Sequence, residues 1–398
     1  MDSARLLDLS GYWSFWDRDL PATVPRDVTL PRRLRDSLVL VIQGVRRCGK
    51  STLMAQLMRR YRLNPKHCAF LNFEDPRLGH PLDHTLLDAW VAAFRGAHPR
   101  LKNAFFFLDE VHGVEGWERW LRTQLERPRG NHFVVTGSNA RLLSGELSSV
   151  LTGRHVTVEL FPFDLDEFRK VHPGSPLEDY LHQGGFPEPL LLDGGDRLRQ
   201  QYFSDIIERD VRERVGARSA AAVRQVVQMA YESAGAELSL RRIAGVTGVA
   251  VDTAAGYLAA SEDAYLLFAV PYFAFSERKR LARNTKYYPV DTGLRRMVVT
   301  RTGQDRGRLL ECAVQLDLRR RGLRPAYWRG RGEVDFVVTT DRGITPIQVS
   351  WEPTAERHHR ALAEFYETFP QAQEALFVGP EAFESGALAA LEPVGPPA

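Results

Sequence analysis

The feature that most constrains this chain is an eight-residue stretch that satisfies the pattern G-x-x-x-x-G-K-[ST], Gly44-Val45-Arg46-Arg47-Cys48-Gly49-Lys50-Ser51. It follows an apolar run at residues 38–42 and precedes a helix-like stretch at residues 50–61. In this context the two glycines let the backbone wrap a phosphate group, and the helix start supplies N–H groups and a positive dipole end. A glycine turn before an ordinary helix is the simpler alternative, but it does not explain the strand, loop and helix in this order. The stretch predicts a site for nucleotide phosphates.

This loop assigns roles to individual side chains. Lys50 is expected to contact the β and γ phosphates of ATP, and the Ser51 hydroxyl is expected to bind Mg²⁺. The predicted cofactors are therefore ATP and Mg²⁺. The predicted nucleotide-binding residues are Gly44, Val45, Arg46, Arg47, Cys48, Gly49, Lys50, Ser51 and Thr52.

A second apolar run, at residues 104–108, ends in the acidic pair Asp109-Glu110. A buried strand places Asp109 at its carboxyl end beside the metal ion, and Glu110 can then orient or deprotonate the attacking water. A strand that merely ends in solvated acids is the alternative, and the preceding phosphate-binding loop weakens it. The pair predicts hydrolysis of the nucleotide and not binding alone.

Two further positions are candidates for catalysis. The run at residues 132–135 ends in polar residues, of which Asn139, or else Ser138, is expected to contact the γ phosphate or the water. Asn and Ser also favour helix N-termini, so capping is the alternative. Arg154 is expected to stabilise transition-state charge, either in its own chain or across a subunit interface, or else to be an ordinary solvated arginine.

Length and periodicity predict several domains. The 398 residues exceed one ordinary domain, and 44% hydrophobic with 26% charged residues is typical of soluble globular proteins. Apolar runs alternate with helix-like stretches from residue 38 to residue 135, which predicts an α/β fold, a parallel sheet covered by helices on both faces. This P-loop core is expected at residues 36–170, after a lead-in at residues 1–35 that contains Trp13, Phe15 and Trp16.

The C-terminal half predicts three more parts. Residues 171–230 read as a helical lid or connector. Residues 231–295 outline a winged helix-turn-helix, with two short helices, a tight turn at Gly248 and an apolar hairpin. Residues 296–398 predict a smaller α/β domain, with strands at 333–338 and 344–349 and a frayed tail at 392–398.

Several of these segments together resemble prokaryotic AAA-type ATPases that carry the C-terminal domain of unknown function 4143. The resemblance covers residues 38–378, and it implies an ATPase core, a winged helix and a terminal domain similar to the PD-(D/E)XK, or restriction-endonuclease-like, fold. The motifs that carry it are Asn72-Phe73-Glu74-Asp75-Pro76-Arg77, Leu108-Asp109-Glu110-Val111, Thr136-Gly137-Ser138-Asn139, Leu151-Thr152-Gly153-Arg154, Gly184-Gly185-Phe186-Pro187-Glu188, Tyr288-Pro289-Val290-Asp291-Thr292-Gly293 and Glu333-Val334-Asp335-Phe336.

The nuclease-like fold implies a metal site made by a helix Glu, a strand Asp and an E-x-K tripeptide. Glu311 and Asp335 fit the first two positions, but the tripeptide reads Gln348-Val349-Ser350. Gln348 can still offer a carbonyl oxygen, whereas Ser350 cannot supply an ammonium group. This departure predicts a vestigial site that keeps the fold for binding or regulation. Glu311 and Asp335 as ordinary solvated acids are the alternative.

Nucleic-acid contacts, if any, are expected on the wing of the helix-turn-helix. The recognition helix at residues 251–260 contains Asp252 and no Lys or Arg, which argues against firm phosphate contacts there. A nearby run offers five cations, Arg278, Lys279, Arg280, Arg283 and Lys286. A solvated basic hairpin is the alternative. The net charge of +3 decides nothing.

Cys48, Cys68 and Cys312 are far apart and lack metal-ligand spacing, which favours a reducing cytoplasm over a disulfide framework. No apolar run is long enough to span a bilayer, so no membrane partner is expected. The overall prediction is an Mg-ATP-hydrolysing switch or motor that acts on a partner, either DNA or a protein, and that can form homo-oligomers. The alternatives are an ATP-gated nuclease and an ATP-regulated interaction module.

Overall fold

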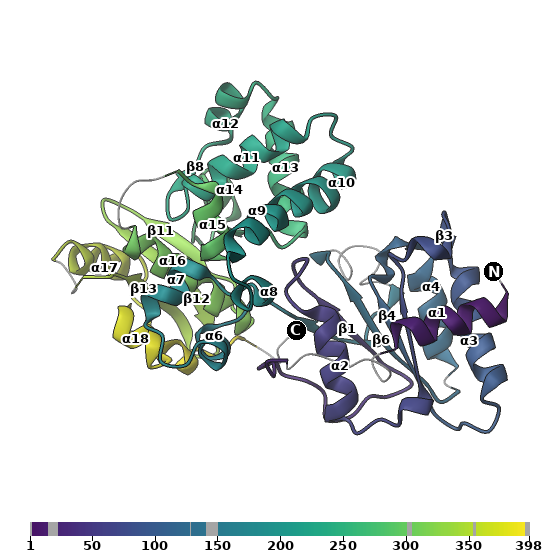
Figure 1. Ribbon diagram of the computed structural model, residues 1–398. Helices are drawn as coiled ribbons and strands as arrows, with labels where there is room; N and C mark the ends of the chain where they lie inside the picture. Colours follow the sequence, from purple (N-terminus) through teal and green to yellow (C-terminus); the bar gives the residue numbers. More distant parts are fainter. Residues whose placement is uncertain are drawn as a thin grey trace. The chain divides into compact units, whose positions relative to one another are not determined.

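The computed structural model describes residues 2–14, 23–127, 129–140, 150–300, 305–352 and 356–394. Phe15 and Trp16 of the predicted lead-in, and residues 395–398 of the predicted tail, lie outside the described residues. The chain divides into two compact units, Met1–Leu160 and Phe161–Ala398, which can be followed by their colours in Figure 1.

The first unit is built on a five-stranded sheet in which every strand pair is parallel, in the order β2-β4-β6-β1-β7. This sheet confirms the predicted α/β core. Sequence reasoning did not anticipate the edge strand β7 or the helix α3. The elements in chain order are α1 (Ser3–Trp13), β1 (Val39–Gln43), α2 (Lys50–Arg60), β2 (Cys68–Asn72), β3 (Leu82–Asp83), α3 (His84–Ala97), β4 (Ala104–Asp109), β5 (Val114–Glu115), α4 (Trp117–Glu126), β6 (Asn131–Gly137) and β7 (His155–Glu159).

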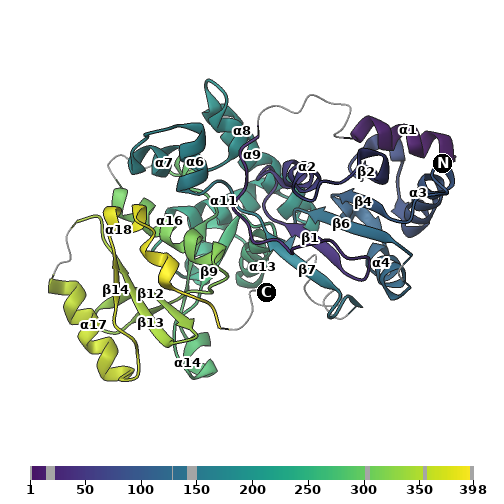
Figure 2. The same ribbon diagram turned by 90° about the horizontal axis from the view of Figure 1, so that it is seen from below.

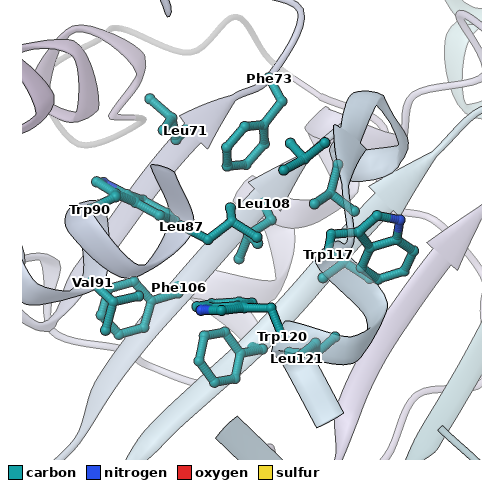
Figure 3. Close-up of a cluster of buried hydrophobic side chains, with 14 of the residues drawn as sticks. Leu71, Phe73, Leu87, Trp90, Val91, Phe106, Leu108, Trp117, Trp120 and Leu121 are labelled. Carbon is teal, nitrogen blue, oxygen red and sulfur yellow. The ribbon is translucent and has the colours of Figure 1, made fainter. Parts of the chain in front are cut away.

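Helices cover both faces of this sheet. Val39 and Val41 of β1 belong to a buried cluster that also takes in α1, α3 and α4. The intervening residues of β1 are buried as well and point to the opposite face, because side chains alternate along a strand. The buried apolar side of α2 lies outside that cluster and packs on this second face, against β6. Figure 3 shows the first cluster, in which the rings of Trp90 and Phe106 meet edge to face with centroids 5.4 Å apart.

The lead-in folds onto the core at two places. In α1, the Trp13 Nε1–H donates to Asp75 Oδ2 at 2.7 Å. Beyond the undescribed residues 15–22, the chain runs along α2, where Gln56 Nε2 donates to the Val24 carbonyl at 2.7 Å and the Tyr61 hydroxyl donates to the Pro31 carbonyl at 2.6 Å. The described residues of the lead-in therefore pack on the core of the first unit.

The second unit begins with helices and continues with two sheets (Figures 1 and 2). The helical stretch supports the predicted connector. The elements of the second unit in chain order are α6 (Leu165–Val171), α7 (Leu177–Gln183), α8 (Pro187–Leu190), α9 (Gly195–Asp205), the π-helix η5 (Ile206–Arg212), α10 (Glu213–Val215), α11 (Ala220–Glu232), β8 (Glu237–Leu238), α12 (Leu240–Thr247), α13 (Val251–Asp263), β9 (Leu267–Val270), α14 (Glu277–Leu281), β10 (Thr285–Pro289), α15 (Thr292–Val298), α16 (Arg306–Arg320), β11 (Ala326–Arg329), β12 (Glu333–Thr340), β13 (Gly343–Val349), α17 (Glu356–Thr368), β14 (Leu376–Val378) and α18 (Pro380–Glu384).

Two of these helices form a helix-turn-helix. α12 ends at Gly248, whose φ of 72° is the left-handed conformation that glycine adopts readily, and α13 follows at an angle of 106°. The prediction of an apolar hairpin directly after α13 is wrong. The apolar stretch supplies one strand, β9, whose partner β10 begins fifteen residues beyond it, on the far side of α14. Together they form the antiparallel sheet β8-β10-β9.

The last part is a four-stranded sheet in the order β11-β12-β13-β14. β12 and β13 form the predicted hairpin around Asp341-Arg342-Gly343, and Gly343 has a φ of 119°. Trp328 and Phe365 meet edge to face in the core between this sheet and α17. In the described part of the chain no single helix has the length and apolar character of a membrane span, although the bent pair α12 and α13 reaches that threshold when taken together.

Candidate nucleotide site

The predicted phosphate-binding loop joins β1 to α2 and has the backbone conformation that its sequence requires. A Cβ atom at Gly44 would lie 2.0 Å from the carbonyl oxygen of Leu160, so only glycine fits there. Gly49 has a φ of 101° and is the N-cap of α2, which has no side-chain cap. The first N–H groups of α2 are thus left uncapped by any side chain. This arrangement fits an anion such as a phosphate group.

Lys50 is buried at the base of this loop, with 4% of its surface exposed. Its Nζ donates to the carbonyl oxygens of Gly44 and Val45, at 3.1 and 3.3 Å. It also lies 3.2 Å from Oε1 of Glu110, which follows β4 at the same edge of the sheet. The structure therefore brings together the lysine and the acid that the sequence assigned to phosphate binding and water activation.

The predicted metal ligands also meet. The Ser51 hydroxyl donates to Oδ2 of Asp109 at 2.7 Å. The other carboxylate oxygen, Oδ1, accepts a hydrogen bond from the Thr136 hydroxyl at 2.6 Å. Asn72 Nδ2 donates to Oδ2 at 3.2 Å. A hydroxyl and a carboxylate oxygen at hydrogen-bond distance are donors that suit Mg²⁺.

Glu110 has a backbone φ of 54°, in the left-handed region that is uncommon for residues other than glycine. Its backbone N–H donates to the Thr136 hydroxyl at 3.0 Å, and its Oε2 accepts from the Ser138 backbone N–H at 3.0 Å. His112 Nδ1 lies 3.2 Å from the same oxygen. These contacts hold the Glu110 carboxylate beside the phosphate-binding loop. A backbone conformation that is uncommon for its residue type often occurs at functional sites.

The pKa values of the two acids are shifted in opposite directions. Burial, and after it the adjacent Glu110 carboxylate, raise the pKa of Asp109 to about 6. Burial also opposes ionisation of Glu110, but Lys50 and His112 outweigh it and lower the pKa of Glu110 below its ordinary value. At neutral pH Glu110 is therefore a carboxylate, paired with an ammonium. That is the protonation state that a general base needs.

The two candidate sensor residues occupy different positions. β6 ends at Gly137, and the fully buried Ser138 follows with its N–H on Glu110. Asn139 lies one residue further on and is half-buried. The strand tip thus contacts the acidic pair through Ser138 and Thr136, and the assignment of a sensor role to Asn139 stays a prediction.

Arg154 does not lie near the loop of its own chain. It precedes β7, and β7 is parallel to β1 with His155 opposite Val39 and Glu159 opposite Gln43. The phosphate-binding loop follows Gln43, so Arg154 is at the other end of the strand, about 16 Å away at about 3.3 Å per residue. The prediction that it acts in its own chain is wrong, and a role across a subunit interface stays a prediction.

Sequence reasoning missed four side chains at this site. Asn72, His112 and Thr136 contact the acidic pair, and Arg26 Nη1 donates to the Cys48 carbonyl of the loop at 2.7 Å. Thr136 could have been found, because it occupies the carboxyl end of a strand beside β4, where polar side chains converge. Arg26 had no signal, since a long-range contact from an irregular segment has no periodicity.

The predicted wing cations fall into two groups. Arg278, Lys279, Arg280 and Arg283 are exposed on or after α14, and Arg280 pairs with Glu277. Lys286 belongs to β10 and is fully buried, so its prediction as a DNA contact is wrong. The reason is register, because its neighbours along β10 alternate between the two faces and Lys286 points inward.

Of the positions predicted for a vestigial nuclease site, Glu311, Asp335 and Gln348 are close together in the second unit. Gln348 Nε2 donates to Oδ2 of Asp335 at 2.6 Å, and the same buried lysine, Lys286, lies 3.9 Å from Oε1 of Glu311. Ser350 lies at the end of β13, where its N–H donates to the Val378 carbonyl at 3.1 Å. Ser350 supplies no ammonium group here, but β10 supplies one through Lys286, for which the sequence predicted a different role.

The parallel five-stranded sheet, with its phosphate-binding loop and acidic pair, defines a P-loop AAA-like α/β domain. Residues 36–169 match the AAA domain, and they are followed by two domains of unknown function, DUF8612 at residues 175–305 and DUF4143 at residues 306–385. These successive matches confirm the resemblance to AAA-type proteins that carry DUF4143 at their C-terminal end. The DUF4143 match is narrower than the resemblance implied, since residues 175–305 match DUF8612.

Several relatives are uncharacterized proteins. One from Haemophilus influenzae is 28% identical over 80% of this chain and 84% of its own length. One from Methanocaldococcus jannaschii is 28% identical over 85% of this chain and 80% of its own length. Among solved structures, that of Cdc6p from Pyrobaculum aerophilum is 13% identical over 65% of this chain and 78% of that one, with a TM-score of 0.28. That likeness is too low to carry an argument.

Proposed function

We propose that this chain binds and hydrolyses Mg-ATP, and that its nucleotide state switches the second unit on a partner. The AAA domain match implies ATP binding and hydrolysis for the first unit. The observation that carries the proposal further is the contact between Lys50 and Glu110, at 3.2 Å, beside that between Ser51 and Asp109, at 2.7 Å. Phosphate binding, metal binding and water activation would then use one buried cluster.

Lys50 exchanges partners in this proposal. Without nucleotide its ammonium is held by the Glu110 carboxylate and by two loop carbonyls. Triphosphate oxygens carry more negative charge than one carboxylate and attract the ammonium into the loop. Glu110 then loses its main counter-ion and becomes free to accept a proton from water, while Ser138 and His112 keep it in position.

The residues that would hold the metal ion are Ser51 and Asp109. Bound there, Mg²⁺ would neutralise charge on the β and γ phosphates. Ser51 gives up its hydrogen bond to Asp109 for this purpose, whereas Thr136 and Asn72 keep that carboxylate oriented. Such outer partners tune the metal affinity of a site.

The partner that we favour for the second unit is DNA. The helix-turn-helix of α12 and α13, with the sheet β8-β10-β9, has the outline of a winged helix. The exposed cations on and beside α14 would contact the phosphate backbone of the DNA, where neutralised phosphates release their bound counterions and so favour binding. α13 carries Asp252 and no Lys or Arg. Binding would therefore depend on the phosphate charge of the DNA and discriminate little between base sequences.

The experiment is steady-state hydrolysis of Mg-ATP by the full chain, with and without double-stranded DNA. The variants are Lys50→Ala and Glu110→Gln. Their matched controls are Lys66→Ala and Glu115→Gln, at exposed positions of the same unit. We expect turnover in the wild type and both controls and none above background in the two test variants.

The outcomes separate the proposals. Turnover that survives Lys50→Ala and Glu110→Gln contradicts the catalytic assignment, whereas nucleotide binding without turnover in the wild type supports an interaction module. Stimulation by DNA that is lost when Arg278 and Lys279 are both changed to Gln supports the wing contact. Turnover that DNA leaves unchanged moves the partner to a protein. DNA cleavage in Mg²⁺ would instead support the ATP-gated nuclease.

A further inference from the structure

Lys286 is the most unusual charged side chain in the second unit. It is the second residue of β10, and none of its side-chain surface is exposed. Its Nζ is 2.5 Å from Oε1 of Glu333 and 3.9 Å from Oε1 of Glu311. An isolated ammonium is too costly to bury, so these carboxylates must compensate it.

The surroundings of this ammonium are built for it. The Tyr327 ring lies 5.1 Å from Nζ, within the range of a cation–π contact. The Tyr288 hydroxyl donates to Oε1 of Glu311 at 2.5 Å. A Cβ atom at Gly235 would lie 2.7 Å from Oε2 of Glu311, so a glycine there leaves room for the carboxylate.

Asp335 completes the group of acids. Its Oδ2 accepts hydrogen bonds from Gln348 Nε2 at 2.6 Å and from the Val349 backbone N–H at 2.8 Å. Asp335 is close enough to Lys286 to influence the pKa of that lysine. Burial lowers the pKa of Lys286, but the carboxylates of Glu311, Glu333 and Asp335 outweigh burial and raise it above its ordinary value. Lys286 is therefore charged.

A metal ion does not fit this cluster as it stands. The nuclease-like fold implies a divalent cation between Glu311, Asp335 and the Gln348 position, and the ammonium lies among these same side chains. Within the described ranges, no three His, Cys, Asp or Glu side chains are arranged to hold a metal ion. Ser350 has no cationic group, and the ammonium group in the cluster is that of Lys286, which belongs to the sheet β8-β10-β9.

We propose that Lys286 is a built-in cation which takes the place of the divalent metal ion in this nuclease-like cluster. The cluster then needs no metal, and its ion pairs join β10 of one sheet to α16 and β12 beside it. The helix-turn-helix sheet and the terminal sheet would move as one body, because separating them would leave Lys286 buried without a partner. This inference stands without the proposed ATPase activity.

One feature favours the rival outcome, a functional metal site with Lys286 as its ammonium. Gln348 has 4% of its surface exposed, and its Oε1 has no hydrogen-bond partner among the described residues. A divalent ion could use that oxygen. The two possibilities predict opposite responses to metal in the wild type.

The experiment is thermal unfolding of the full chain without nucleotide, in EDTA and in Mn²⁺. The test variant is Lys286→Met, and the matched control is Lys279→Met, a lysine that is exposed on α14. We expect Mn²⁺ to shift the wild type and the control equally little. Lys286→Met should unfold roughly 10 °C lower in EDTA, as follows from breaking a buried ion pair in a unit of this size.

Mn²⁺ should restore much of that loss in Lys286→Met alone, because Glu311, Glu333 and Asp335 then lack a cation. If Lys286→Met does not fold, Lys286→Met with Glu333→Gln removes the opposing charge as well and should fold better than the single variant. A Mn²⁺ shift in the wild type that Asp335→Asn abolishes would overturn the proposal. So would a Lys286→Met protein that is as stable as the wild type.

Discussion

Each unit of this protein buries a lysine against a glutamate, and the two pairs differ in what surrounds them. Lys50 lies at the start of a helix, on a loop whose carbonyls share it with Glu110. Lys286 lies within a strand, enclosed by a tyrosine ring and by carboxylates from α16 and β12. A lysine on a loop at a helix N-terminus can exchange its carboxylate for a phosphate, whereas one enclosed in a strand keeps it. The comparison teaches that the neighbours of an ion pair decide whether it is a switch or a fixed link.

The largest expected effect is on kcat, which should depend on Glu110 of the first unit and not on Glu333 of the second. Glu110→Gln should lower kcat about 10²- to 10⁴-fold, because a general base contributes that much. The affinity for ATP should be retained, since Lys50 remains. Glu333→Gln should leave kcat unchanged below its unfolding temperature, and a comparable loss of turnover there would break the comparison.

The two lysines should differ in nucleotide affinity. Lys50→Met should weaken binding of a fluorescent ATP analogue by at least about tenfold, because the loss of a charge-assisted hydrogen bond costs about 1.5 to 3 kcal/mol. Lys286→Met should leave the Kd unchanged. Equal affinities of the Lys50→Met protein and the wild type would remove the phosphate role of Lys50.

Thr136 tests how far the acidic pair depends on its supports. Thr136→Val removes the hydroxyl that donates to Asp109 and accepts from the Glu110 N–H, both buried. The first unit should lose about 1 to 3 kcal/mol in its free energy of unfolding, measured with urea. Thr136→Ser keeps the hydroxyl and serves as the control, so equal losses in both variants would show that packing and not hydrogen bonding matters.

The smallest effect concerns pH in the second unit. Burial raises the pKa of Asp335 well above its ordinary value, and Glu311 and Glu333 add to this while Lys286 opposes it. A folded-state pKa above the unfolded one gives stability that is present at low pH and is lost as pH rises through the folded pKa. We expect wild-type stability to fall with rising pH relative to Asp335→Asn. Parallel pH profiles of the two proteins would contradict the raised pKa of Asp335.

Much of the first unit could be predicted because local pattern and topology agree there. A glycine loop between an apolar strand and a helix has few structural outcomes, and an acidic pair that ends another parallel strand lies at the same edge of the sheet as that loop. Asp109 and Glu110 therefore followed from the sequence. The position of Arg154 did not, because strand direction decides which edge of the sheet it occupies.

The second unit was less predictable because its polar contacts join distant segments. Lys286 stands in a basic run, which favours a solvated surface, and only the pairing of β10 with β8 and β9 turns it inward. Its carboxylate partners are 25 and 47 residues further along the chain, at Glu311 and Glu333. No periodicity within β10 encodes such contacts.

The measurement that tests the contrast between the two sites most directly is a Mn²⁺ titration of the full chain, followed by electron paramagnetic resonance, with and without ADP. We expect about one Mn²⁺ to bind per chain with ADP present, to be lost in Asp109→Asn, and to be retained in Asp335→Asn. A tight Mn²⁺ site that forms without nucleotide and disappears in Asp335→Asn would contradict the assignment of the metal to the first unit and of the built-in cation to the second.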